Sequence, residues 1–504
     1  MYFEPVFIFS FAITLFWIAY KIFGKNFMLS YPDNRKKHNF PKSQIGGLIF
    51  GPLFLLLCYF INLAPYWYII GGIVCILLGF TDDIRSVHWI IKLIVQLSLA
   101  IYLVHIFDGE FEKINFYNFS IFLQEPYLNI IFIFWFVGIL NAVNLIDGVD
   151  GLAGGYIILL SISMAIFGSV AFNYLHLILL LILLAFLLFN QRQSKIFMGD
   201  AGSLFLGYHT ATLPLLYYDM QPGLQLLNVT PFILIASYLI ADTSRVVLTR
   251  LAQKKHPMGA DTIHFHHLML QKSGSYLSSV GFIYLINLLA VIGVVYGVEN
   301  LFSTNFMIIH LSLILIFILT PPLQTYVPII TKTVGPFYNW QKTPNLDPPL
   351  IYRTLFIFML LVILVLSIFI NNVNLSEIIN LQNSLALLLI SIFVFLNYKT
   401  EIAMYAILLG AVIFFGTITW TSQLNIITKI ITVFLFISFI IFTLEKRKGC
   451  YLKEYSALDV LMIILMIGCL PFTVISAPFS SWTIFLLYSL WFGLSFVLRR
   501  TINN

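Results

Sequence analysis

Short polar segments carry the residue types that could perform chemistry in an otherwise apolar chain. Residues 141–155 contain the carboxylates Asp147 and Asp150 and the carboxamides Asn141 and Asn144. Carboxylate and amide oxygens suit a hard cation such as Mg²⁺, and the neighbouring glycines let backbone approach a ligand closely. Acidic groups at membrane depth are costly, which makes this cluster a functional hypothesis; a polar turn between two spans is the alternative.

A second acidic segment contains Asp82 and Asp83, followed nine residues later by Lys92. Adjacent carboxylates point in different directions, so one can meet a metal ion or a proton while the other orients it. A nearby lysine can neutralise phosphate oxygens. The alternative is a pair of N-cap residues for the next helix, expected over 88–107.

The third segment is a Gly-Asp-x-Gly-Ser turn that follows Lys195. Its tight geometry could bring Asp200 and backbone N–H groups to a metal-bound phosphate. A simple helix N-cap formed by Ser203 explains this pattern equally well.

The fourth segment, residues 254–267, holds His264, His266 and His267. Histidines can donate hydrogen bonds to phosphate, so the segment favours anion binding. A zinc site is less favoured, because these positions do not share one helix face and no fourth ligand is evident.

Composition places these segments in a membrane protein. The chain has 504 residues, of which 60% are hydrophobic and 10% charged, and its mean hydropathy is +0.96. Soluble domains carry about 25% charged residues. Aromatic residues do not alternate with basic ones as in a nucleic-acid platform, so no nucleic-acid partner is expected. The four cysteines are isolated, so their spacing indicates neither a disulfide framework nor a zinc site.

The elements that must position the polar segments are helices, since many apolar runs reach the ~20 residues needed to cross a bilayer. We therefore predict an all-α polytopic membrane protein with about 17 transmembrane helices. Eleven of them form a core, over residues 3–23, 44–62, 66–80, 88–107, 128–145, 151–171, 174–190, 202–219, 230–250, 276–298 and 304–325. Six more follow, over residues 351–371, 383–397, 402–421, 425–444, 457–477 and 482–498.

Charge asymmetry predicts the orientation. Basic residues after the first span mark that loop as cytoplasmic, which places the N-terminus outside and the C-terminus in the cytoplasm. All segments with chemical character then face the cytoplasm. The proline-rich residues 326–350 are expected to be a cytoplasmic linker between a core domain, 1–325, and a C-terminal transmembrane extension of unknown role, 351–504.

Taken together and in this order, the four motifs resemble those of the polyprenyl-phosphate N-acetylhexosamine-1-phosphate transferases of glycosyltransferase family 4. The resemblance covers about residues 1–325 and implies roles for individual residues. Asp200 and Asn144 would meet Mg²⁺, for which Mn²⁺ can substitute. Catalytic roles fall to the residues at the two acidic motifs and the lysine, namely Asp82, Asp83, Lys92, Asp147 and Asp150. Substrate contacts fall to Asn141, Asn144, Asp147, Asp150, Lys195, His264, His266 and His267.

The resemblance implies transfer of a HexNAc-1-phosphate, such as GlcNAc-1-phosphate, from a UDP-sugar to undecaprenyl or another polyprenyl phosphate, with release of UMP. This is the first membrane step in the synthesis of cell-envelope polysaccharides such as the O-antigen of lipopolysaccharide. The expected place is the bacterial inner membrane with a cytoplasmic active site, and a homodimer is compatible with it. A transporter or flippase of a polyprenyl-linked or anionic substrate is the alternative.

Two departures from the family pattern bear on the donor. Family members often have Asp-Arg before the histidine motif, where this chain has Asp261-Thr262. The motif itself reads His-Phe-His-His and not three consecutive histidines. The second departure points away from a muropeptide donor and towards a simple UDP-N-acetylhexosamine.

Overall fold

The structure is a computed structural model. It describes residues 3–24, 26–31, 41–107, 113–117, 119–122, 126–165, 168–190, 194–221, 226–254, 263–273, 276–300, 310–311, 314 and 389. The chain divides into two compact units, one formed by Met1–Trp17 with Val334–Asn504 and the other by Ile18–Thr333. The second unit contains all four polar segments. The predicted linker 326–350 and extension 351–504 lie outside the described residues, apart from residue 389, so this domain division stays a prediction.

Helices dominate the described residues. They are α1 (Pro5–Phe23), α2 (Gly46–Phe60), α3 (Tyr66–Ile84), α4 (Trp89–Ile106), α5 (Tyr127–Ile146), α6 (Leu152–Met164), α7 (Val170–Leu187), α8 (Gly199–Asp219), α9 (Thr230–Ala252), α10 (Phe265–Ser273) and α11 (Tyr276–Asn300). Five short strands accompany them: β1 (Leu29–Ser30), β2 (Lys42–Ser43), β3 (Lys113–Phe116), β4 (Phe119–Phe122) and β5 (Leu227–Asn228). The fold is thus mostly helical, and the strands are a departure from the all-α prediction.

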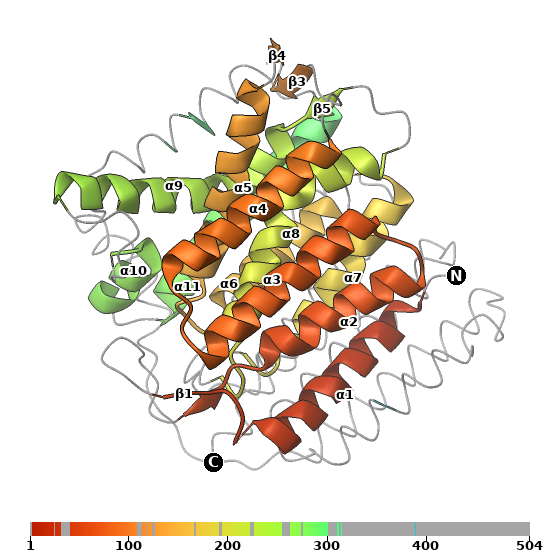
Figure 1. Ribbon diagram of the computed structural model, residues 1–504, viewed down its shortest axis with the longest axis vertical. Coiled ribbons are helices and arrows are strands. Elements are labelled where there is room, and N and C mark those ends of the chain that lie inside the picture. Colours follow the sequence, from red (N-terminus) through yellow and green to blue (C-terminus); the bar gives the residue numbers. More distant parts are fainter. Residues whose placement is uncertain are drawn as a thin grey trace, which may run out of the picture. The chain divides into compact units, whose positions relative to one another are not determined.

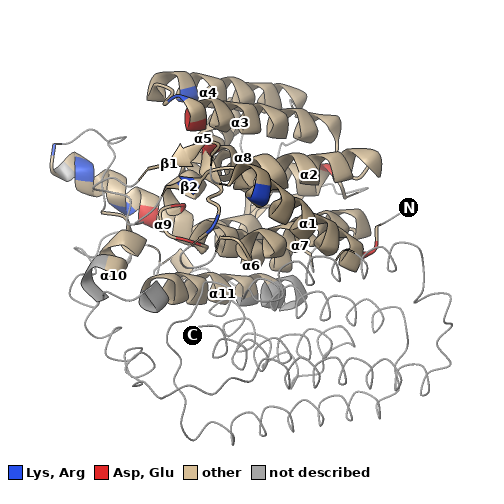
Figure 2. Cartoon of the chain, turned by 90° about the horizontal axis from the view of Figure 1, so that it is seen from below, with Lys and Arg blue, Asp and Glu red and all other residues tan. Residues whose placement is uncertain are grey.

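Six of the described helices are long and apolar enough to cross a membrane, as expected of a polytopic membrane protein. They are α1, α3, α4, α5, α7 and α9. Figure 2 shows long uncharged stretches in most of these helices, whereas α9 carries charged residues within its second half. The predicted span 304–325 falls almost entirely outside the described residues.

One helix, α8, forms the centre of the second unit. It packs against α2, α3, α5 and α9, and it lies in the middle of the bundle in Figure 1. Glycines allow the close approach of its neighbours: a Cβ added to Gly79 of α3 would lie 2.3 Å from the backbone nitrogen of Ala201. A Cβ on Gly47 of α2 would lie 2.1 Å from the nitrogen of Gly202. The N-terminal turn of α8 therefore touches two helices backbone to backbone.

The segment before α8 is held by main-chain hydrogen bonds to the segment before α2. Phe197 N–H donates to the Ser43 carbonyl (2.8 Å), and the N–H groups of Gly46 and Gly47 donate to the carbonyls of Phe197 and Met198 (2.9 and 2.8 Å). These bonds also satisfy N–H groups at the start of α2, which lack partners inside that helix. The start of α8 is thereby fixed to the start of α2.

Candidate active site

Asp83 lies in the last turn of α3 and caps the N-terminus of α8. Its carboxylate accepts hydrogen bonds from the backbone N–H groups of Asp200 (2.9 Å) and Ala201 (3.0 Å), and from the Gln44 side chain (3.2 Å). The first N–H groups of a helix have no partner inside it and attract negative charge. The acidic pair was expected to cap helix 88–107 if it had a structural role. The N-cap of α4 is instead His88, whose ring nitrogen accepts from Ile90 N–H (3.4 Å).

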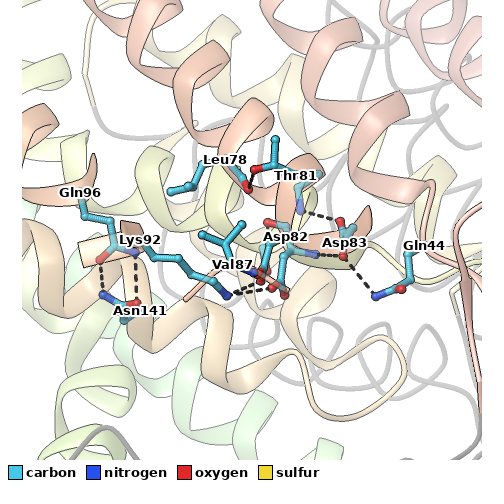
Figure 3. A network of polar contacts seen from close by, with 12 residues as sticks. Gln44, Leu78, Thr81, Asp82, Asp83, Val87, Lys92, Gln96 and Asn141 are labelled. Atoms are coloured by element: carbon cyan, nitrogen blue, oxygen red, sulfur yellow. Dashed lines mark hydrogen bonds and ion pairs between the residues drawn. The ribbon is translucent and has the colours of Figure 1, made fainter. Parts of the chain in front are cut away.

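Asp82, Lys92 and Asp200 meet at the same end of the bundle although they come from three helices. Figure 3 shows the Lys92 side chain reaching Asp82. The Lys92 ammonium forms an ion pair with Asp82, and its nitrogen lies 3.5 Å from Asp200 Oδ2. Asp82 also accepts a hydrogen bond from Val87 N–H (2.6 Å), which holds the chain between α3 and α4 in a tight turn. Lys92 therefore forms contacts with the carboxylates of two acidic motifs that lie far apart in the sequence.

Asn141 is paired with Gln96 of α4 in a reciprocal amide contact (Figure 3). The Asn141 amide donates to Gln96 Oε1 (2.7 Å), and the Gln96 amide donates to Asn141 Oδ1 (3.2 Å). Gln96 is buried. The pair ties α4 to α5 one helical turn beyond Lys92, so it supports the position of the lysine.

Replacing Gln96 by Leu should destabilise the fold by ~0.6–1.7 kcal/mol, the range found for hydrogen bonds between membrane helices. The loss arises because the Asn141 side chain loses both contacts to Gln96 and keeps only the hydrogen bond that its amide donates to the Val137 carbonyl (2.8 Å). Denaturant unfolding in detergent measures it. The double variant Gln96→Leu/Asn141→Leu removes both polar groups and should recover part of the loss; a double variant that loses the sum of both effects would contradict this account.

The turn between α5 and α6 carries the acidic residues of the longest motif. Asp147 is half-buried at the C-terminus of α5, and none of the described residues donates a hydrogen bond to its carboxylate. Asp150 accepts from the Ser194 N–H (3.1 Å) and hydroxyl (3.0 Å), and the Lys42 ammonium lies 3.9 Å away. Asp150 thus helps to hold the segment before α8, whereas Asp147 stays available to a ligand.

Two further predicted contacts lie beside this turn. Asn144, half-buried in the last turn of α5, accepts from Asp147 N–H through its backbone carbonyl. The Lys195 ammonium lies 5.9 Å from the centre of the Tyr20 ring, within the range of a cation–π contact. The roles predicted for both residues stay predictions.

The histidine motif packs against the same turn. A Cβ added to Gly148 would lie 2.8 Å from His266 Nε2 and 2.9 Å from His267 Nε2. His266 and His267 belong to α10, a helix that the sequence did not predict, and their ring centres are 4.2 Å apart. Burial, and then the neighbouring His267, lower the pKa of His266 well below its ordinary value, so its ring is neutral. The structure therefore brings together the acidic turn and the histidines.

The carboxylates of the site outnumber the basic side chains that neutralise them. Burial, a hydrogen bond with the Asp82 carboxyl and the charge of Asp83 raise the pKa of Asp200 to about 8. Burial, and then the charges of Asp200 and Asp150, raise the pKa of Asp147 well above its ordinary value. A divalent cation among these oxygens would relieve the repulsion.

The donor chemistry suits Mg²⁺, although no group of three His, Cys, Asp or Glu side chains in the described part of the chain is gathered closely enough to hold a metal ion. Mg²⁺ is commonly bound by one or two carboxylates together with substrate phosphates and water. The partly exposed Asp200 carboxylate, one-third accessible to solvent, can serve as such a ligand. The residues present therefore fit a cation that binds with a phosphorylated substrate.

Comparison with known proteins decides the family. Residues 66–218 match the family described as Glycosyl transferase family 4. A Bacillus subtilis (strain 168) protein named "Probable undecaprenyl-phosphate N-acetylglucosaminyl 1-phosphate transferase" is 31% identical over 327 residues, which cover 62% of this chain and 87% of the relative. The chain belongs to glycosyl transferase family 4.

Two further relatives are similar to parts of this chain. The Thermotoga maritima "Undecaprenyl-phosphate alpha-N-acetylglucosaminyl 1-phosphate transferase" is 30% identical over 58% of this chain and 89% of its own length. The Petrotoga mobilis "Phospho-N-acetylmuramoyl-pentapeptide-transferase" is 32% identical over 42% of this chain and 72% of its own length. The resemblance seen in the motifs is thereby confirmed.

The sequence did not single out Asp242 and Arg245, two charged residues of α9. Asp242 accepts a hydrogen bond from His264 Nδ1 (2.9 Å), so it lies directly behind the histidine motif. The sequence did contain a signal for these two residues, since both lie within the predicted span 230–250. Charged residues within an apolar span are rare and usually functional.

Proposed function

We propose that the chain transfers a HexNAc-1-phosphate from a UDP-sugar to a polyprenyl phosphate. The observation that carries this proposal is the meeting of Asp82, Lys92 and Asp200, from α3, α4 and α8, beside the acidic turn of Asp147. A lipid-phosphate oxygen attacks the β-phosphorus of the UDP-sugar. The new P–O bond gives polyprenyl-diphosphate-sugar, and the bond from the β-phosphorus to the bridging oxygen breaks to release UMP. Relatives named as N-acetylglucosaminyl 1-phosphate transferases favour GlcNAc as the sugar.

Asp200 and Asn144 would hold Mg²⁺, which when bound neutralises charge on the diphosphate. The Lys92 ammonium lies between the carboxylates of Asp82 and Asp200. From that position it can neutralise the oxygens of a phosphate bound beside Asp200. Asp82 orients the lipid phosphate or takes its proton, and Asp83 fixes the N-terminus of α8, which carries Asp200.

The remaining predicted residues surround the donor. Asp147 faces the ligand from the turn after α5. Asn141, Asp150 and Lys195 hold the walls of the site through contacts to Gln96, Ser194 and Tyr20. The three histidines contact the donor from the start of α10 and from His264, the residue before it.

The reaction would take place at the cytoplasmic face of a bacterial inner membrane. A soluble nucleotide-sugar reaches the site from water, while the apolar tail of the acceptor stays among the helices. This placement rests on the clustering of the polar residues at one end of the bundle and on the basic residues of the same loops.

The test is UMP release by the full chain, purified in detergent, with Mg²⁺, undecaprenyl phosphate and a series of UDP-N-acetylhexosamines. We expect release that needs the lipid and stops when EDTA removes the metal, and the best donor identifies the sugar. Protein that is folded but releases no UMP with any donor would overturn the proposal. Transport of a polyprenyl-linked lipid, measured in vesicles, would then be the activity to examine.

A further inference from the structure

A buried ion pair lies inside α9, directly behind the histidine motif. Asp242 and Arg245 are 1% and 4% exposed, one helical turn apart, and Arg245 Nη2 donates to Asp242 Oδ1 (2.8 Å). Their helix is apolar enough to span a membrane. Charges in such a helix are costly and usually serve a function.

The contacts of this pair converge on the start of α10. Asp242 Oδ1 also accepts from the backbone N–H of Phe265 (3.1 Å), the first residue of that helix. Arg245 Nη2 donates to the carbonyl of Ile263 (2.7 Å). The pair is therefore hydrogen-bonded to the backbone on both sides of His264, and it accepts from an N–H group that has no partner within α10.

The second carboxylate oxygen of Asp242 fixes the ring of His264. Nδ1 of His264 lies 2.9 Å from Asp242 Oδ2 and carries the proton of this hydrogen bond. Nε2 is then the ring nitrogen left for a ligand. It is buried without a partner among the described residues, as are both ring nitrogens of His266. Leaving buried polar atoms unpaired is costly, and a bound ligand would offset that cost.

The three histidine rings connect this pair to the acidic turn. His264 stacks on His266 with ring centres 5.8 Å apart and planes inclined by 18°, and His266 lies beside His267 at 4.2 Å. The far end of this row packs against Gly148, next to Asp147. A change in the orientation of His264 is thus passed on to the place where the donor would bind.

We propose that Asp242, held in place by Arg245, is a positioning residue that orients the row of His264, His266 and His267 towards the nucleotide-sugar donor. This inference rests on the proposed function. Asp242 acts through His264 and does not itself touch the substrate, because its carboxylate is fully engaged by protein donors. It should therefore affect the donor and leave the lipid acceptor unaffected.

The experiment compares Asp242→Asn, His264→Gln and the double variant in the full chain. Groups that orient a histidine through its second nitrogen contribute about 10–100-fold at metal sites, and we expect the lower end here: about a tenfold higher KM for the UDP-sugar, with the KM for lipid phosphate unchanged. The double variant should be no worse than His264→Gln. Asp219→Asn is the matched control, since Asp219 accepts from the Trp67 indole (2.8 Å) at the other end of α8; it should match wild type.

Each outcome decides between the two proposals. If wild type releases UMP and Asp242→Asn has the KM of wild type, the positioning role is wrong and the function stands. Effects that add in the double variant mean that Asp242 acts by another route, which also overturns the positioning role.

If Asp242→Asn does not fold, Arg245→Lys weakens the same hydrogen bonds and should shift the donor KM in the same direction. If wild type turns over no donor, the same variants are compared by calorimetric binding of UDP-GlcNAc; absence of binding to wild type overturns both proposals.

Discussion

Asp200→Asn should reduce the rate of UMP release by about 100–1,000-fold, the cost of removing one electrostatic group aimed at developing charge. Asp200 is the acid on which Lys92, Asp82 and the capped start of α8 converge. The carboxamide keeps the shape and the backbone hydrogen bonds to Asp83 but cannot offer two anionic oxygens to a cation. The measurement is the initial rate at saturating donor and lipid over a range of Mg²⁺ concentrations.

Asp219→Asn tests whether this loss is specific. The two aspartates lie at opposite ends of one helix, so the same chemical change is made in the same element. We expect the Asp219 variant to keep the activity of wild type. A folded Asp200→Asn protein with more than about a tenth of the wild-type rate would exclude a central role for this carboxylate, since that loss corresponds to less than ~1.4 kcal/mol of transition-state stabilisation.

Gly79→Ala should destabilise the protein and impair the site at the same time. The added methyl group would lie 2.3 Å from backbone atoms of Asp200 and Ala201, which cannot rotate away as a side chain can. Overpacking of this kind typically costs about 1–3 kcal/mol, more than the gain of up to ~1 kcal/mol that alanine brings to a helix. We expect a lower melting temperature in detergent and a lower kcat, because α8 must move and Asp200 moves with it.

Gly138→Ala is the matched control, because a Cβ added at Gly138 of α5 meets nothing within 4 Å. Here the helix propensity of alanine is gained without a clash, so stability should stay equal or rise slightly. Equal melting temperatures and rates for the Gly79 and Gly138 variants would show that α3 and α8 can separate without consequence.

Much of the helical core could be predicted from hydropathy, since the nine predicted spans from 44–62 to 276–298 each overlap an observed helix. The main error concerns α3, predicted to end at residue 80. It continues to Ile84, so Asp82 and Asp83 belong to the helix and not to a loop. The polar residues end the apolar run but not the helical backbone, because their carboxylates find partners in Lys92 and in the start of α8.

The parts that could not be predicted depend on contacts between distant segments. Helix α10 is short and polar in sequence, and it is stabilised by burial of Phe265 and Met269 and by its capping at Asp242. Asp150 matched a donor-site residue by pattern, yet its contact with Ser194 spans 44 residues of chain. No local pattern indicates such pairings. The motifs indicated residues that the structure brings close together, whereas the hydrogen-bond partners of each side chain could be found only in the structure.

The main-chain bonds that join Ser43, Gly46 and Gly47 to Phe197 and Met198 have a consequence for how this protein can diverge. A hydrogen bond between backbone groups does not depend on side-chain identity, so residues such as 197 and 198 can drift among relatives without releasing the segment. Adding or deleting a single residue would instead shift every later pairing by one position and carry Asp200 out of register. Within these two paired segments, chain length should therefore be conserved more strictly than the identity of the side chains.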